Sequence, residues 1–340
     1  MQATEPSTHD APAAGTADVQ RIAAFSDGAE GGNPAGVWIG AALPPDAEMQ
    51  RIAHAIGFSE TAFAAPLDAT PLDTAPQDAA PQDAAPEAGG YRVRYFSPEA
   101  EVPFCGHATI ALGAALAAAQ GDGVFALTLN DARITVEGRS EKSYKGHEAG
   151  NGISADPTSA STSAPTSAPT SAPISAALQS PPTRSAPAPA DVVDRALALF
   201  GYRHEDLDPR IPPALAHGGA DHLVLALRSR AALSAMHYEL DAGRAFMREL
   251  GIVTVVLAWA ESDTLFHTRN PFAAGGVYED PATGAGTAAL AGYLRDLGWP
   301  HGGAIDVVQG EDMSMRSRLH ASFDATPGTS IRVSGTARFM

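Results

Sequence analysis

The sequence has little cysteine, few basic residues and no long apolar run. One cysteine, Cys105, among 340 residues excludes an intramolecular disulfide framework and a zinc site built from several thiolates. Lysine and arginine number 22 against 39 acidic residues, and the net charge of -17 would repel a nucleic-acid backbone. No stretch of 18 apolar residues occurs, and the N-terminus lacks the pattern of a secretory signal. We therefore expect a soluble, cytoplasmic protein that binds neither nucleic acid nor membranes.

Several familiar motifs of catalytic sites are missing as well. The 11 histidines include no HExxH sequence, and the chain has no Walker A, GxSxG or GxGxxG sequence. His217 and His222 lie around two glycines without an obvious third ligand, so we expect no metal site. Because nothing indicates a dinucleotide, we also expect no cofactor.

Three segments are rich in Ala, Pro, Ser, Thr, Asp and Gly, and they bury too little apolar surface to fold. One has a five-residue period and another a four-residue TSAP period, which is typical of flexible linkers. The first period falls between two strand-like runs, Thr61 to Ala65 and Tyr91 to Phe96, so it indicates an insertion between strands. The expected domains are a disordered tail (1–19), an N-terminal lobe (20–137, with an insertion at 66–90), a linker (138–190) and a C-terminal lobe (191–340).

A longer pattern occurs once in each lobe. Residues 94–119 and 265–298 each contain a strand-like run, a proline-containing loop, a glycine turn and an alanine-rich helix. This similarity predicts two related lobes whose central helices begin at neighbouring strand ends. The free amides and positive dipole ends of two such helices would form a site for a carboxylate between the lobes.

Four short segments carry the candidate chemistry: GGNPAG (31–36), GFSETAF (57–63), PFCGHAT (103–109) and YEDPATGAG (278–286). Taken singly, each also has a structural interpretation. Position alone favours an exposed loop for Glu60, a helix-capping role for His107 and a helix start for Asp280, while Asn33 is as consistent with a turn as with a substrate contact. A single cysteine such as Cys105 is more often a small buried apolar residue than a nucleophile. Carboxylate and imidazole groups are nevertheless the usual agents of proton transfer near neutral pH.

Together and in this order, the four segments resemble the PhzF-like family of phenazine biosynthesis proteins. The likeness spans both lobes and continues in Gln309-Gly310 and Met315-Arg316. This resemblance implies an α+β fold of the diaminopimelate-epimerase type. Such a fold has two pseudo-symmetric lobes, each a curled, mostly antiparallel sheet around a central helix, with the active site between them.

The resemblance also implies roles for individual residues. Glu60 matches the family's general acid/base, and His107 and Asp280 match polar partners that hold the substrate and relay the proton. The resemblance further implies a homodimer. Relatives with two opposed catalytic thiols share the fold, but one cysteine makes that mechanism unavailable here. The predicted substrate-binding residues are Asn33, Gly106, Thr283, Gly284 and Ala285.

The prediction is thus an isomerase that shifts a proton within a small carboxylate-bearing metabolite without a cofactor. One alternative is an epimerase or racemase that uses Glu60 and a second base. Another is a non-catalytic small-molecule binder, because the family often has serine where this chain has Ala285.

Overall fold

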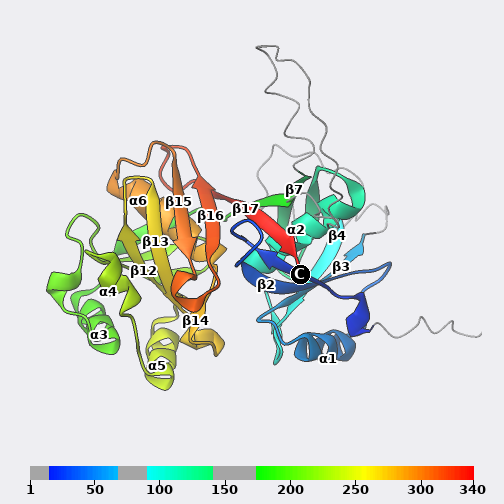
Figure 1. Cartoon of the computed structure of the whole chain (residues 1–340), viewed down its shortest axis with the longest axis horizontal. Coiled ribbons are helices and arrows are strands. Elements are labelled where there is room, and N and C mark those ends of the chain that lie inside the picture. Colours follow the sequence, from blue (N-terminus) through cyan, green and yellow to red (C-terminus); the bar gives the residue numbers. More distant parts are fainter. Residues whose placement is uncertain (1–14, 68–89, 141–173) are drawn as a thin grey trace, which may run out of the picture.

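The computed structural model describes residues 15–67, 90–140 and 174–340. Figure 1 shows two lobes side by side, the first coloured blue to teal and the second green to orange. The last strand, in red, returns from the second lobe to the first. Within the described residues, no helix is both long and apolar enough to cross a membrane.

The first lobe consists of strands that surround one long helix. Its strands are β1 (Gln20–Ala24), β2 (Asn33–Ile39), β3 (Thr61–Pro66), β4 (Tyr91–Phe96), β5 (Glu101–Val102), β6 (Gly123–Thr128), β7 (Arg133–Ser140) and β8 (Ile174–Gln179). Its helices are α1 (Asp46–Ile56) and α2 (Gly106–Gln120), and the short 3-10 helix η1 spans Thr16–Asp18. Residues 107 to 117 of α2 are all buried, so this helix forms the centre of the lobe.

The second lobe repeats this plan and adds helices on its outer side. Its strands are β9 (Arg184–Pro187), β10 (Ala214–His217), β11 (Asp221–Ala226), β12 (Thr254–Ala260), β13 (Leu265–Pro271), β14 (Glu279–Asp280), β15 (Ala304–Gln309), β16 (Ser317–Ser322) and β17 (Arg332–Phe339). Its helices are α3 (Ala190–Phe200), α4 (Arg230–Ser234), α5 (Leu240–Leu250) and α6 (Gly284–Leu297), with 3-10 helices η3 (His204–Asp206), η4 (Ala273–Gly275) and η5 (Glu311–Met313). The central helix here is α6, which packs on β9, β10 and β16.

Strand pairing establishes that the lobes are versions of one unit. In the first lobe, β1–β2 is antiparallel, β2–β3 parallel, β3–β4 antiparallel, β4–β6 parallel, and β6–β7 and β7–β8 antiparallel. The sequence β10, β11, β12, β13, β15, β16 and β17 has the same order of directions. The internal repeat and the two-lobed α+β fold predicted from the sequence are therefore confirmed.

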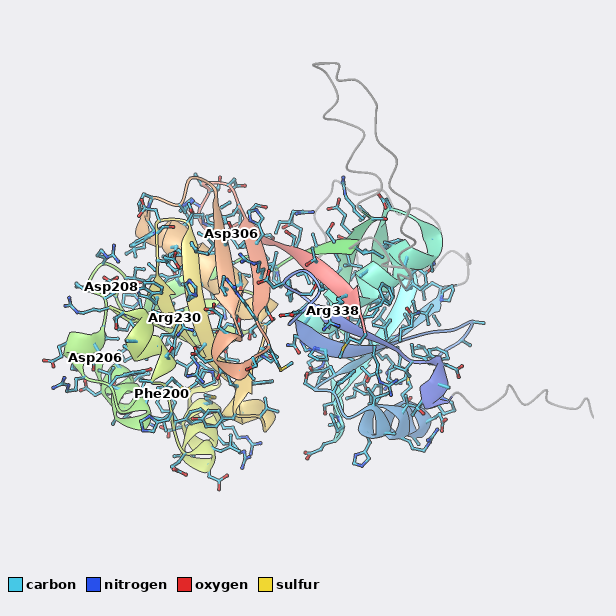
Figure 2. The ribbon with its side chains drawn as sticks, in the orientation of Figure 1. Phe200, Asp206, Asp208, Arg230, Asp306 and Arg338 are labelled. Atoms are coloured by element: carbon cyan, nitrogen blue, oxygen red, sulfur yellow. The ribbon has the colours of Figure 1, made fainter. Side chains whose placement is uncertain are left out.

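The C-terminal strand belongs to both lobes. In β17, Arg332 to Ser334 pair with β16, whereas Ala337 to Phe339 pair with β1. Arg332 to Ala337 also pair with β8, which closes the first sheet into a ring around α2. Figure 2 accordingly places Arg338 in the first lobe, where it donates to the carbonyl of Gly31 at 3.2 Å. The range predicted for the second lobe, 191–340, therefore ends with a strand that also belongs to the first lobe.

The linker predicted over 138–190 is wrong at both ends. Residues 138–140 continue β7, and 174–187 contain β8 and β9. Ile174, Ala176 and Leu178 point inward at 2 to 7% exposure, an alternating apolar pattern that the surrounding serine, alanine and proline obscure. Residues 141–173 lie outside the described residues, as do residues 1–14 of the predicted tail.

The low-complexity insertion joins two neighbouring strands, as the sequence indicates. β3 and β4 are antiparallel, with Pro66 opposite Tyr91, and the Leu67 amide donates to the Gly90 carbonyl at 2.7 Å. The pairing of β3 with β4 thus extends up to the two residues that flank positions 68–89. Residues 68–89 themselves are outside the described part of the chain.

Helix α2 packs closely on β7 because Gly138 lacks a side chain. A Cβ at this position would lie 2.4 Å from the Gly113 carbonyl oxygen and 2.7 Å from the Ala117 Cβ. We expect Gly138→Ala to lower the free energy of unfolding by about 1–3 kcal/mol, measured by urea denaturation, because the backbone of α2 must move away. Gly123→Ala on β6 is the control, since its Cβ would find the nearest atom, in Phe125, at 3.5 Å. Equal losses in both variants would contradict this account.

Candidate active site

Glu60 lies at the end of the chain segment that enters β3. Its carbonyl accepts a hydrogen bond from the Gly36 amide at 3.1 Å, which fixes this residue beside β2. Its side chain is only 12% exposed, and Phe58 and Phe63 pack together behind it in a small apolar cluster. The exposed loop that position alone favours is therefore wrong, because the phenylalanines on either side are anchored in the core.

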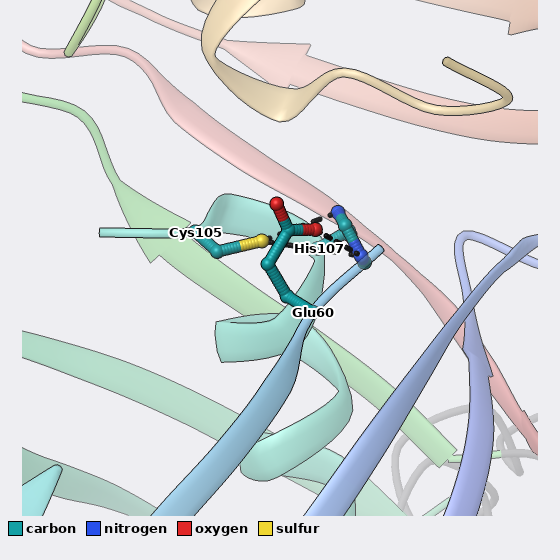
Figure 3. Close-up of side chains that lie close together, drawn as sticks. All are labelled: Glu60, Cys105 and His107. Atoms are coloured by element: carbon teal, nitrogen blue, oxygen red, sulfur yellow. Dashed lines mark hydrogen bonds and ion pairs between the residues drawn. The ribbon is translucent and has the colours of Figure 1, made fainter. Parts of the chain in front are cut away.

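The first turn of α2 brings two more side chains to Glu60. The Nε2 atom of His107 lies 3.5 Å from Oε2 of Glu60 and 3.4 Å from the hydroxyl of Ser59. The Sγ atom of Cys105, the residue that precedes α2, lies 3.3 Å from Nδ1 of His107. Figure 3 shows Glu60, Cys105 and His107 pointing toward one another. The imidazole is 7% exposed, so a proton can pass between buried partners.

The thiol of this cluster is held in its neutral form. Burial raises the pKa of Cys105 well above its ordinary value, and the nearby Glu60 carboxylate raises it further. Cys105 is a buried residue, as predicted. It is also part of the polar cluster, which the sequence did not indicate.

Asp280 supplies a carboxyl group from the other lobe. It lies on β14, three residues before Thr283, the residue that precedes α6, and thus does not cap the helix. Its Oδ1 accepts from the Asn33 side chain at 2.7 Å, and its Oδ2 accepts from the Thr283 hydroxyl at 2.6 Å. Gln309 donates to its backbone carbonyl at 2.6 Å. Because Asn33 starts β2, this network joins the two lobes directly.

The electrostatics of Asp280 link it to the cluster on α2. Burial raises the pKa of Asp280 to about 6, with His107 opposing that change and the charge on Glu60 adding to it. A carboxyl group with a pKa near 6 exchanges protons readily at neutral pH. Each lobe therefore places one carboxyl group at a shared site, Glu60 from the first lobe and Asp280 from the second.

The central helices begin next to each other at this site. A Cβ built on Gly106 would lie 4.0 Å from Cα of Gly284, so the first residues of α2 and α6 are in near contact. The first N–H groups of an α-helix have no acceptor within the helix. Two helix N-termini thus converge where the sequence predicts a carboxylate-binding site.

The side chains of the remaining predicted binding residues differ in whether they already have hydrogen-bond partners within the protein. The Asn33 amide donates both to Asp280 and, at 3.0 Å, to the Ala282 carbonyl, and the Thr283 hydroxyl bonds Asp280 and Gln309. Both side chains therefore hold Asp280 in place. Ala285 lies in the first turn of α6 and offers no side-chain donor there.

Sequence reasoning did not identify Gln309, Ser59 or Cys105 as site residues. Gln309 is 1% exposed and accepts from the Thr283 amide at 3.1 Å while donating to Asp280. Its signal was present in the sequence as a polar residue that ends an apolar strand, β15, beside the Gly310 turn. Ser59 and Cys105 are immediate neighbours of predicted residues, so only the geometry distinguishes their contacts.

The raised pKa of Asp280 has a measurable effect on stability. Between the ordinary pKa of 3.8 and about 6, the folded protein binds more protons at this group than the unfolded chain. Asp280 therefore makes the folded state less stable as pH rises from 4 to 7, by about 2 kcal/mol. Asp280→Asn does not titrate, so its free energy of unfolding relative to the wild type should rise by that amount over this range.

Urea denaturation of both proteins at pH 4, 5, 6 and 7 tests this expectation. Carboxyl groups distant from Asp280 titrate alike in the two proteins and cancel in the difference. A difference that is constant with pH, or that falls as pH rises, would contradict the raised pKa of Asp280.

The fold and the site define a class of two-lobed α+β proteins with acid/base groups between the lobes. A family model described as phenazine biosynthesis-like protein, PhzC-PhzF, matches residues 22–340, and the chain belongs to this family. A structure from Bacillus anthracis, described as a phenazine biosynthesis protein of the PhzF family, matches 95% of the chain and 96% of its own length. Its TM-score is 0.70 at 18% identity.

Two further relatives are similar to this chain over most of its length. The uncharacterized isomerase YddE of Escherichia coli O157:H7 is 25% identical over 296 residues, which covers 86% of this chain and 84% of that protein. A Pseudomonas aeruginosa structure described as a predicted epimerase has a TM-score of 0.68 at 22% identity and covers 95% of this chain and 96% of its own. Family membership and the names of the curated relatives support an enzyme of the isomerase type, as the sequence predicts.

Proposed function

We propose that this enzyme shifts a proton within a small carboxylate-bearing metabolite bound between the two lobes, without a cofactor. Glu60 removes a proton from an activated carbon, and His107 or Glu60 returns it at another position. The observation that supports this most directly is the 3.5 Å contact between the Glu60 carboxylate and the His107 imidazole, both largely buried. A buried pair of this kind can pass a proton from one of its groups to the other.

The substrate carboxylate binds at the paired N-termini of α2 and α6. Backbone N–H groups and the positive dipole ends of both helices favour an anion there. Gly106 and Gly284 allow close approach because neither has a side chain at the contact. Binding at this place sets the reactive carbon beside Glu60, His107 and Asp280, and positioning supplies part of the rate acceleration.

The experiment is incubation of the purified protein with a mixture of small amino, hydroxy and unsaturated acids in D₂O, followed by mass spectrometry. A compound that gains deuterium only when the enzyme is present identifies both substrate and reaction. Deuterium gain that is the same with Glu60→Gln would contradict the mechanism. Saturable ligand binding without any exchange would indicate the non-catalytic binder instead.

One observation favours an epimerase as the second candidate. Asp280 reaches the site from the lobe opposite to Glu60 and has a pKa of about 6, so the two carboxyls can act on opposite faces of one carbon. Chiral chromatography of the product separates the candidates. Inversion at one carbon supports the epimerase, and a moved double bond supports the isomerase.

The proposed assembly is a homodimer, and the proposed setting is the cytoplasm. Both follow from the resemblance to the family and from the composition of the chain. Light scattering that gives the mass of a monomer would contradict the dimer.

A further inference from the structure

The cluster on α2 has a second chemical capability besides proton transfer. Glu60, Cys105 and His107 each offer one ligand atom, and these three atoms all lie within 4.8 Å of one another. They are a carboxylate oxygen, a sulfur and an imidazole nitrogen, the three donor types that zinc binds in proteins. In the part of the chain that the structure describes, this is the one group of its kind.

The distances within the cluster are near those of tetrahedral coordination. Zinc–ligand bonds of about 2.0–2.3 Å at tetrahedral angles separate nitrogen from oxygen by about 3.3 Å and nitrogen from sulfur by about 3.6 Å. Here Nε2 of His107 lies 3.5 Å from Oε2 of Glu60 and 3.9 Å from Sγ of Cys105. Shifts of a few tenths of an ångström would therefore bring these two distances to the values of a zinc tetrahedron. The three side chains would fill three of its four positions, and a water molecule can take the fourth.

The charge around the cluster favours a cation. The Glu60 carboxylate belongs to the cluster itself, and Asp280 is a second carboxyl group close to it. Among the described residues, no arginine forms an ion pair with either carboxylate. A divalent cation would neutralise Glu60 and the thiolate together, while the thiol gives its proton to solvent.

We propose that Glu60, Cys105 and His107 form a binding site for a borderline-soft divalent cation such as Zn²⁺, and that the bound ion inhibits the enzyme. The sulfur ligand selects Zn²⁺ over Mg²⁺ and Ca²⁺, which prefer oxygen ligands. Inhibition follows because the ion occupies the lone pairs with which Glu60 and His107 would take up protons. This second part rests on the proposed function, whereas the binding of the ion does not.

The test of binding uses Co²⁺ as a spectroscopic substitute for Zn²⁺. Cys105 is the only cysteine of the chain, so a near-ultraviolet thiolate-to-Co²⁺ charge-transfer band can come from no other residue. We expect this band in the wild type at one Co²⁺ per chain, its displacement by one equivalent of Zn²⁺, and its persistence in excess Mg²⁺. Cys105→Ser should lose the band and bind Zn²⁺ at least ~100-fold more weakly, since even partners outside the coordination sphere contribute roughly 10- to 100-fold.

The control variant is His204→Ala, which removes an exposed histidine paired with Asp194 in the second lobe. It should keep the band and the Zn²⁺ affinity of the wild type. Absence of the band from the wild type, or equal Zn²⁺ affinity in the wild type and Cys105→Ser, would overturn the proposal. Should Cys105→Ser fail to fold, wild-type melting temperature provides a second measurement: it should rise with Zn²⁺ and not with Mg²⁺.

The two proposals fail in distinguishable ways. Once a substrate is known, deuterium exchange should fall in proportion to the Co²⁺ or Zn²⁺ bound and recover on addition of a chelator. Exchange that continues unchanged with the charge-transfer band at full height would overturn the inhibitory role. A band without any substrate in the D₂O screen would leave the cation site standing and count against the proposed isomerase.

Discussion

Glu60→Gln is expected to lower the rate of deuterium exchange into the substrate by about 10²- to 10⁴-fold, the usual contribution of general acid/base catalysis. Glutamine has the shape of glutamate and can still contact His107, so the 12%-exposed side chain has no reason to leave its place. It cannot accept a proton at neutral pH. The loss should therefore appear in kcat with KM nearly unchanged, because the helix N-termini still bind the substrate carboxylate.

The control for this variant is Glu99→Gln. Glu99 is an exposed glutamate in the loop between β4 and β5 of the same lobe, so its substitution changes the net charge equally. We expect wild-type exchange rates from it. Full exchange by Glu60→Gln, or an equal loss in both variants, would contradict the role given to Glu60.

The second large effect is a loss of stability when the buried Arg269–Glu279 ion pair next to Asp280 is broken. Arg269 on β13 donates to the carboxylate of Glu279, with Nε 3.0 Å from Oε1, and the two side chains are only 9% and 2% exposed. Arg269 also donates to the backbone carbonyls of Ser234 and Met236, which ties β13 to the segment after α4. Because Glu279 precedes Asp280 on β14, this pair fixes the strand that carries the Asp280 carboxyl group.

Arg269→Met should lower the free energy of unfolding by about 3–5 kcal/mol, because it leaves a buried carboxylate without its partner. Urea denaturation measures this. Adding Glu279→Leu to Arg269→Met should recover most of the loss, since the remaining carboxylate is then gone. Removing the exposed Arg195–Glu249 pair is the control and should change the midpoint little, because solvent screens that pair. A double variant no more stable than Arg269→Met would refute the explanation.

The sequence predicts the repeat of the fold because local signals agree in both halves. Glycine turns before alanine-rich helices locate the starts of α2 and α6 correctly at Gly106 and Gly284. The strands β8 and β9 are missed because their apolar residues are few and lie among serine and proline. Their stability comes from pairing with β7, β10 and β17, which are distant in sequence, and no local pattern records such partners.

The site shows the same division. The order of four motifs places Glu60, His107 and Asp280 in one region, and the structure brings Glu60 and His107 into contact. Their predicted catalytic roles remain predictions. What the motifs do not contain is the mutual arrangement: the engagement of Asn33 and Thr283 with Asp280, the contribution of Gln309, and the contact of Cys105 with His107. The contact between Asn33 and Asp280 depends on how the two lobes are oriented relative to each other. That orientation cannot be read from a single sequence.

The position of β17 has a consequence for the order in which the protein can be made. Roughly 150 residues separate the end of β8 from the start of β17, so synthesis at about 5–20 residues per second delays ring closure by roughly 8 to 30 s. During that interval the nascent first lobe has unpaired backbone groups along β1 and β8, a hazard for association with other chains. Folding of the first lobe is therefore completed only after β17 has left the ribosome, and the two lobes become stable together.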